Sequence, residues 1–215
     1  AILITHTHAD HISGLQTLLK RCAAPVFTTE RAARELSWRL PGAETRLDAL
    51  DFGIPQSIGE FAVTAFPTSH DAPGSCGFRL DAAGGAVGVL TDTGYVTDEA
   101  ADILEGVDLA VLEANHDIET LRSGPYPYYL KQRILGAQGH LSNEDAARFA
   151  AVLAQSGTSE IILAHLSREN NTPAMAQTAV ERALSAAGVS PLLSVAPRDC
   201  LGPAHTVSRR SVCRR

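Results

Sequence analysis

The sequence predicts an α/β fold, and three observations favour it. Short apolar or β-branched runs alternate with amphipathic helical stretches along most of the 215 residues, a pattern typical of sheets covered by helices. Hydrophobic residues make up 45% of the chain, which is enough for one core. Histidines and acidic residues directly follow several of the apolar runs. We therefore expect one layered domain whose chemistry lies along one rim of the sheet.

The densest group of candidate ligands follows the first predicted strand. Residues 1–4 are an apolar run, a strand is expected at 2–5, and a histidine-rich stretch follows directly. Because side chains alternate along a strand, His6 and His8 point to the same side as the chain leaves the sheet. Asp10 and His11 fall where the chain bends into an amphipathic helix. The two pairs suit two adjacent divalent cations that activate water; unconnected core or surface histidines are the alternative.

Composition limits the class of protein. A net charge of −6 argues against a broad basic surface for nucleic acid, although two bound cations would add positive charge where a phosphate lies. The sequence contains no apolar run of about 18 residues that could span a membrane, so we expect a soluble protein without membrane contact. The four cysteines form no C-x-x-C pair. We expect reduced thiols and a cytoplasmic location, with a disulfide as the alternative.

The chain then alternates helix and strand up to another histidine. The expected elements are a helix at 10–20, a strand at 25–29, a helix at 30–40, short strands and turns over 49–59, and a strand at 61–66. His70 lies just beyond the last of these strands. It is either a further ligand or a histidine of a surface loop.

Asp92 follows a predicted hairpin. Strands at 75–80 and 86–90 are separated by a turn at 81–85 that contains two glycines, which are good hairpin residues. Asp92 comes two residues after the second strand and two residues before Gly94. It is a candidate ligand at a strand end, or an Asx-turn residue before the glycine.

Glu113 and His116 follow a helix expected at 96–106 and a buried strand expected at 107–112. Their place at a strand end makes both candidates for orienting ligands or for catalysis. A structural ion pair is the alternative for Glu113. For His116 we favour a position on the surface.

Residues 121–133 combine three tyrosines with three cationic side chains. Tyrosine rings stack on bases and Arg or Lys holds phosphates, which predicts a contact surface for a single nucleic-acid strand. A loop stiffened by proline, with its tyrosines packed on the domain, is an equally good interpretation.

The last third repeats the pattern of helix and strand. The expected elements are a helix capped by Ser142, a strand at 160–165, a helix at 174–187 and a strand at 192–195. His140 precedes the first of these elements and His165 ends the second. We place the domain at residues 1–198. The basic tail at 199–215 is expected to be disordered; the alternative is that its charge helps to hold nucleic acid.

These motifs together resemble the metallo-β-lactamase fold superfamily of dinuclear metallohydrolases. They are THTHADHI from Thr5, SHDA from Ser69, TDTGYV from Thr91, EANHD from Glu113, GHLSNE from Gly139 and HLS from His165. The resemblance implies an αββα sandwich that binds two divalent metal ions. It implies that one ion is bound by His6, His8 and His70, that the other is bound by Asp10, His11 and His165, and that Asp92 bridges them. Such mixed ligands are compatible with zinc, manganese or iron, and the sequence does not choose among them. A carboxylate at position 92 argues against a true zinc β-lactamase.

The motifs from Gly139 and His165 are similar to those of tRNase Z and related phosphodiesterases. In those enzymes a histidine assists the leaving group and a glutamate holds it, which matches His140 and Glu113; Asp10 is the third expected catalytic residue. Within the superfamily, the set of motifs most resembles the bacterial YycJ (WalJ) branch. The resemblance implies a 5′ to 3′ DNA exonuclease with a part in DNA repair, for which single-stranded DNA is one expected substrate.

In this superfamily several strands precede the first histidine motif. The chain starts with Ala1 inside a predicted strand, so we expect a fragment that lacks its N-terminal strands. Two other functions remain open. One is a hydrolase of small molecules such as cyclic phosphodiesters, thioesters or lactones, and the other is a metal-binding module without catalysis. The sequence does not indicate an oligomeric state.

Overall fold

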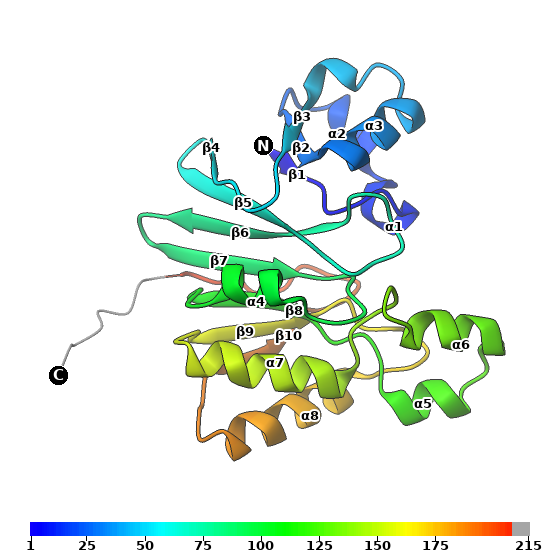
Figure 1. The fold of residues 1–215 in the computed structure, drawn as a ribbon, viewed down its shortest axis with the longest axis vertical. Helices are drawn as coiled ribbons and strands as arrows, with labels where there is room; N and C mark the ends of the chain where they lie inside the picture. Colours follow the sequence, from blue (N-terminus) through cyan, green and yellow to red (C-terminus); the bar gives the residue numbers. More distant parts are fainter. Residues whose placement is uncertain (208–215) are drawn as a thin grey trace.

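The computed structural model describes residues 1–207 and builds them from two sheets with helices on their outer faces (Figure 1). The elements of the smaller sheet and its helices are strands β1 (Ile2–Leu3), β2 (Val26–Thr29) and β3 (Leu47–Leu50), helices α1 (Ala9–Ile12), α2 (Leu15–Leu19) and α3 (Glu30–Arg39), and a short 3-10 helix (Glu44–Arg46). The strands pair in the order β1-β2-β3, and all of them run parallel.

The larger sheet has seven strands. They are β4 (Gln56–Ile58), β5 (Phe61–Pro67), β6 (Cys76–Ala82), β7 (Gly85–Leu90), β8 (Leu109–Glu113), β9 (Glu160–Ala164) and β10 (Leu192–Val195). The helices of this part are α4 (Asp98–Leu104), α5 (Ile118–Ser123), α6 (Tyr128–Leu135), α7 (Asn143–Gln155) and α8 (Pro173–Ala186). The strand order is β10-β9-β8-β7-β6-β5-β4.

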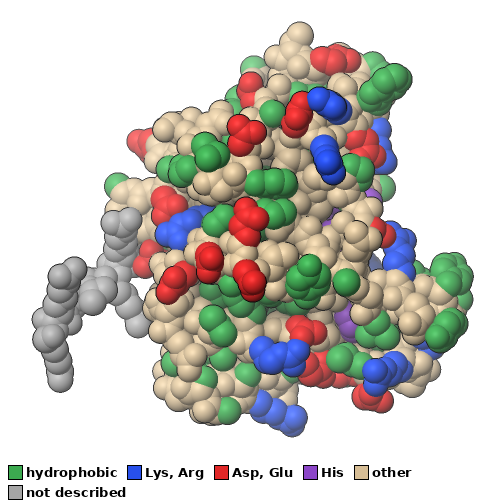
Figure 2. All heavy atoms as spheres, viewed as in Figure 1, with side chains coloured by type: hydrophobic (Ala, Val, Ile, Leu, Met, Phe, Trp, Pro, Cys, Tyr) green, Lys and Arg blue, Asp and Glu red, His purple; other side chains and the backbone are tan. Residues whose placement is uncertain are grey.

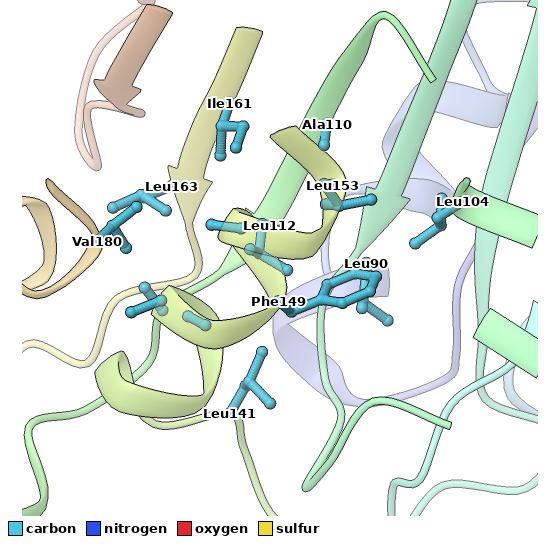
Figure 3. Packing of buried hydrophobic residues seen from close by; sticks show 14 of the residues in the cluster. Leu90, Leu104, Ala110, Leu112, Leu141, Phe149, Leu153, Ile161, Leu163 and Val180 are labelled. Carbon is cyan, nitrogen blue, oxygen red and sulfur yellow. The ribbon is translucent and has the colours of Figure 1, made fainter. Parts of the chain in front are cut away.

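Buried side chains fill three spaces between the layers. Phe27 of the smaller sheet and Phe78 of the larger sheet belong to the cluster between the two sheets. A second cluster, which includes Leu36, lies between the smaller sheet and α1–α3. The largest cluster joins the larger sheet to α4, α7 and α8, and Figure 3 shows part of it, with Phe149 of α7 and Leu112 of β8. The layers are therefore helix, sheet, sheet and helix, and the predicted αββα sandwich is confirmed.

The direction of the strands brings the candidate site together. Strands β7, β8 and β9 are parallel, and β5 runs the same way because it is antiparallel to β6, which is antiparallel to β7. The segments that follow these four strands thus emerge at one edge of the sheet. The backbone N–H of Cys76, at the start of β6, donates to the carbonyl of Thr5 at 3.0 Å. This bond fixes the histidine-rich stretch after β1 at the same edge.

Side-chain caps explain why several helices begin where the sequence predicts. Thr29, Thr97, Ser142 and Thr172 each accept a hydrogen bond from the backbone N–H three residues later. Such a cap contributes about 1 kcal/mol to helix stability. The start of α7 is the one that matters for the site, because His140 lies just before it.

Two expectations about the elements are wrong. The helix expected at 10–20 is interrupted at Ser13 and Gly14 and forms two short helices, α1 and α2; glycine is a poor helix former, which favours the break. The connection before His140 contains helices α5 and α6, which the sequence analysis did not predict. Asp117 caps the first of them by accepting a hydrogen bond from the N–H of Thr120.

The end of the chain is described up to residue 207. Residues 201–207 form no regular element, and His205 contacts the carboxylate of Glu160 on β9. The tail predicted to be disordered includes residues 208–215, which lie outside the described residues, so that expectation stays a prediction. Cys22, Cys76 and Cys200 are free thiols. Among residues 1–207, the helices lack the combined length and apolar character that crossing a membrane requires.

Candidate metal centre

Three histidines from two distant segments form the first ligand cluster. Ring nitrogens of His6, His8 and His70 lie within 4.8 Å of one another. Nε2 of His70 is 3.2 Å from Nδ1 of His8. His70 donates from Nδ1 to the carbonyl of Gly139 at 3.0 Å, and Nδ1 of His6 is 3.1 Å from Oγ1 of Thr5. These contacts leave Nε2 of both rings free to bind a ligand.

Burial favours the neutral form of His6 and His70. It lowers the pKa of His6 to about 2, and the charges of His11, His70 and His8 act in the same direction. Burial also lowers the pKa of His70, against the attraction of Asp92. A neutral imidazole is the form that coordinates a metal ion. These two rings therefore suit a bound cation.

The second cluster contains Asp10, His11 and His165, whose ligand atoms also lie within 4.8 Å of one another. Oδ2 of Asp10 is 3.7 Å from Nε2 of His11 and 3.9 Å from Nε2 of His165. The Asp10 side chain is 69% exposed, in contrast to 2% for that of His70. Asp10 is thus the candidate ligand that faces the opening of the site.

Asp92 lies between the two clusters. Its Oδ2 is 3.4 Å from Nε2 of His11, and its Oδ1 is 3.5 Å from Nε2 of His165 and 3.8 Å from Nε2 of His70. Only 2% of the side chain is exposed. The structure therefore places a buried carboxylate where a group shared by two ions would have to be.

Backbone strain occurs at two of these residues. Within the described chain, the non-glycine residues with positive φ are Asp92 and His165, at 57° and 58°. This conformation costs a histidine about 1–3 kcal/mol, and such strain persists where the surrounding structure and function require it. Asp92 lies two residues beyond the end of β7 and His165 directly follows β9, and these two parallel strands flank β8. The left-handed turn redirects each side chain across the edge of the sheet toward the other ligands.

Glu113, at the end of β8, is fully buried and accepts four hydrogen bonds. Its Oε1 accepts from Nδ1 of His140 and from Nδ1 of His165, each at 2.8 Å. Its Oε2 accepts from the backbone N–H groups of Thr93 and Leu141 at 3.0 and 3.1 Å. Burial alone would raise the pKa of Glu113, but the hydrogen bonds from the two histidines outweigh it and hold the pKa below its usual range. One ionised carboxylate thus orients both rings.

The two histidines respond to Glu113 in the same way. Burial lowers the pKa of each ring, but the hydrogen bond to Glu113 outweighs it, raising the pKa of His140 above its usual value and that of His165 to about 9. In each ring Nδ1 is occupied, so Nε2 is the atom available for a substrate or an ion. The contact of Glu113 with His140 agrees with the expectation from the resemblance, whereas its contact with His165 was not expected.

His116 is not on the surface, so the position favoured from the sequence is wrong. Only 1% of the residue is exposed, and burial lowers its pKa to about 4. Its backbone bridges to Ser142, and its carbonyl accepts from the N–H of Asn143 at 2.9 Å. Backbone contacts therefore join the chain leaving β8 to the start of α7.

The contacts of three further residues beside the site were not predicted from the sequence. Oγ1 of Thr5 lies 3.1 Å from Nδ1 of His6 and 3.2 Å from Nδ1 of His11. Its place beside the histidines was a signal that could have identified it. Asp71 and Arg133 form an ion pair at 2.6 Å across 62 residues of sequence. A contact over that distance leaves no pattern in a single sequence.

A cavity of about 1080 Å³ opens from the two clusters, at the upper end of the range for small-molecule sites. Tyr126, Leu130 and Arg133, from the segment that contains α6, line part of it. Arg168 and Arg198, which follow β9 and β10, also line it. Figure 2 shows histidine side chains, in purple, in the recess between the part that carries α1–α3 and the part that carries α5 and α6.

The donor atoms fit divalent cations. Nε2 of His6 and Oδ2 of Asp92 are buried, and neither has a hydrogen-bond partner among the described residues. A buried polar atom without a partner is costly, and a bound cation would satisfy both. Imidazole and carboxylate ligands together are compatible with zinc or manganese.

Comparison with known proteins identifies the family. Residues 1–166 match the family model described as the beta-lactamase superfamily domain. The chain belongs to this superfamily. It is 36% identical over 190 residues to a Bacillus anthracis protein named exodeoxyribonuclease YycJ, and 39% identical over 190 residues to a Streptococcus pneumoniae protein named exodeoxyribonuclease WalJ. Each alignment covers 87% of this chain and 71% of the relative.

Solved structures support the same fold. The metallo-β-lactamase fold protein YhfI from Bacillus subtilis matches with a TM-score of 0.68 at 20% identity, covering 90% of this chain and 73% of that one. Zn²⁺-bound PqqB from Methylobacterium extorquens matches with a TM-score of 0.60 at 19% identity, covering 90% of this chain and 69% of that one. Together with the family membership, the clustered ligands identify the chain as a metal-dependent hydrolase of the metallo-β-lactamase fold.

Proposed function

We propose that this chain is a dinuclear metal-dependent phosphodiesterase that degrades DNA from the 5′ end. The observation that carries the proposal is the pair of ligand clusters around Asp92, with His140 beside them on a buried glutamate. Two clusters suit an attack on a phosphoryl group, and a protonated histidine suits the departure of a sugar oxygen. Hydrolysis of a thioester has less need of such an acid, because a thiolate departs more readily than a sugar oxygen.

In this proposal, His6, His8 and His70 would hold one divalent ion, Asp10, His11 and His165 would hold the other, and Asp92 would be shared between them. Two ions bound there, zinc or manganese, would supply an activated water molecule and stabilise the charge on the attacked phosphoryl oxygen. Glu113 holds Nδ1 of His165, which leaves Nε2 of that ring available to bind an ion.

His140 is the proposed general acid. Glu113 fixes the ring through Nδ1 and keeps the pKa above its usual value, so Nε2 carries a proton for the departing sugar oxygen. Asp10 is the proposed third catalytic residue. Its carboxylate lines the cavity and is the most exposed of the proposed ligands, so it can accept a proton from the attacking water.

The choice of DNA rests on the relatives, since both proteins named above are called exodeoxyribonucleases. Single-stranded DNA is the expected substrate form. The cavity is lined by a tyrosine side chain, which suits an unpaired base, and by arginine side chains, which suit phosphates. A cytoplasmic location and a part in DNA repair belong to the same proposal.

The function is tested by incubating the protein with Mn²⁺ or Zn²⁺, 5′-labelled single- and double-stranded DNA, and the small ester bis-p-nitrophenyl phosphate. We expect DNA to be shortened from the labelled end and the ester to be hydrolysed. Hydrolysis of the ester without degradation of DNA would favour a small-molecule hydrolase. Binding of metal without hydrolysis of either would favour a metal-binding module.

A further inference from the structure

An arginine on the wall of the cavity is tied to the first ligand cluster through one carboxylate. Arg133, near the end of α6, donates from Nε to Oδ2 of Asp71 at 2.6 Å. The other oxygen of Asp71 lies 3.6 Å from Nε2 of His8 and 3.7 Å from Nε2 of His70. Asp71 therefore fixes the position of Arg133 relative to the place where the first ion is proposed to bind.

The rest of the guanidinium is free to bind something else. Within residues 1–207, Arg133 makes its hydrogen bond through Nε, and neither terminal nitrogen has an acceptor. The side chain is 58% exposed and lines the cavity. Because the group is planar and held at one corner, its two terminal nitrogens present a fixed pair of donors. Such a pair matches two oxygens of a phosphate.

The other arginines of the cavity are less available. A terminal nitrogen of Arg168 donates to Asp199 at 2.7 Å. In Arg198 a terminal nitrogen donates to the carbonyls of Leu166 and Ser167 at 3.0 and 3.1 Å. Arg133 differs from both because its terminal nitrogens are unpaired and because a carboxylate at the ligand cluster orients it.

We propose that Arg133 binds the phosphate of a nucleotide next to the bond that is cleaved, and that Asp71 positions it for this contact. The inference rests on the proposed function and adds to it a residue that distinguishes a polynucleotide from a small ester. Tyr126 and Leu130 line the cavity on the same side, where they offer an apolar surface to the base of that nucleotide. Tyr128 and Tyr129, 77% and 73% exposed, do not line it.

The test compares Arg133→Met and Arg133→Lys with Arg122→Met in the metal-loaded protein. Arg122 lies on α5, is 63% exposed and pairs with Glu119, and it does not line the cavity, so its loss removes the same charge at a matched site. The measurements are binding of a labelled single-stranded oligonucleotide over a series of salt concentrations, KM and kcat for DNA, hydrolysis of bis-p-nitrophenyl phosphate, bound metal and Tm.

For Arg133→Met we expect DNA affinity to fall about 10- to 100-fold, as for the loss of a hydrogen-bonded charge contact. The slope of log K against log salt should fall by about 0.7, the value for one phosphate contact on a single strand. The loss should appear in KM for DNA, with hydrolysis of the small ester within about twofold of the unmodified protein. The DNA affinity of Arg133→Lys should lie between that of the unmodified protein and that of Arg133→Met, because lysine keeps the charge and loses the planar pair of donors. Arg122→Met should leave all of these values unchanged.

Three results would overturn the inference. Equal DNA binding and equal salt slopes for Arg133→Met and Arg122→Met would show that Arg133 does not contact a phosphate. Equal losses with DNA and the small ester, or a loss of metal, would show that Arg133 acts only through the ligand cluster. An unmodified protein that hydrolyses the ester but neither binds nor degrades DNA would refute the proposed function itself, and this inference with it.

Discussion

Glu113 has two partners that would perform different tasks. One oxygen of this buried carboxylate accepts hydrogen bonds from both His140 and His165, so the proposed acid and a proposed ligand share a single support. A carboxylate can accept from two ring N–H groups at once because it has about four lone-pair positions. Removing its charge should therefore disturb the metal site as well as the acid.

The first prediction at the residue scale concerns Glu113→Gln. The amide has one acceptor oxygen, and its NH₂ group would face either the ring N–H groups or the backbone N–H groups of Thr93 and Leu141. We expect metal affinity to fall about 10- to 100-fold, the usual cost of losing a group that orients a ligand, together with a lower rate. A metal titration measures the first effect, and unchanged affinity would contradict the double role.

The second prediction concerns His140→Ala. This ring lies beside the ligand clusters and is not one of the proposed ligands, so we expect the bound metal to be retained. The rate of DNA cleavage should fall about 10²- to 10⁴-fold, the range for losing a general acid. Metal analysis and single-turnover kinetics check the two parts. If the variant loses metal, then His140 is a ligand and its proposed role is wrong.

At the scale of the elements, hydrogen bonds join three loops beside the site. Oγ of Ser69 donates to the carbonyl of Ala137, and the N–H of Gly94 donates to the carbonyl of Ser69. The third contact between these loops is made by Gly139, because its carbonyl accepts a hydrogen bond from Nδ1 of His70. The segments after β5 and β7 and the segment between α6 and α7 therefore hold one another in place. This contact keeps the ligands from different strands at one edge.

A prediction at this scale concerns Gly139→Ala. An added Cβ would lie 2.1 Å from the carbonyl oxygen of Ile134, so the backbone between α6 and His140 would have to move. We expect a loss of about 1–3 kcal/mol in the free energy of unfolding, as for other overpacked sites, measured by urea denaturation. Gly14→Ala is the control, because Gly14 has a φ of −88° and nothing within 4 Å of the new Cβ. Equal free energies of unfolding for the two variants would contradict the expected clash between the added Cβ at position 139 and the carbonyl of Ile134.

The elements differed in how well the sequence predicted them. Strands and capped helices were predicted correctly where alternation or a capping residue acts locally, as at Ser142. Helices α5 and α6 were not predicted, because the glycine and two prolines at 124–127 between them favour a loop and tertiary contacts with the domain decide the outcome. His116 was placed wrongly because its burial depends on tertiary packing, which a single sequence does not show.

At the scale of the whole molecule, the fold explains why residues spread from His6 to His165 meet. Strands β5, β7, β8 and β9 run in one direction, so candidate ligands that follow them share an edge, and the segment after β1 joins them there. This much could be expected from motifs at strand ends. The pairing of Asp71 with Arg133 could not, because it depends on how α6 lies against the cavity.

The most direct test of the account is anomalous scattering from crystals of the metal-loaded protein. We expect two peaks per chain on opposite sides of Asp92, one contacted by His6, His8 and His70 and the other by Asp10, His11 and His165. A single peak, or a peak away from Asp92, would contradict the two-ion centre on which the proposed function depends.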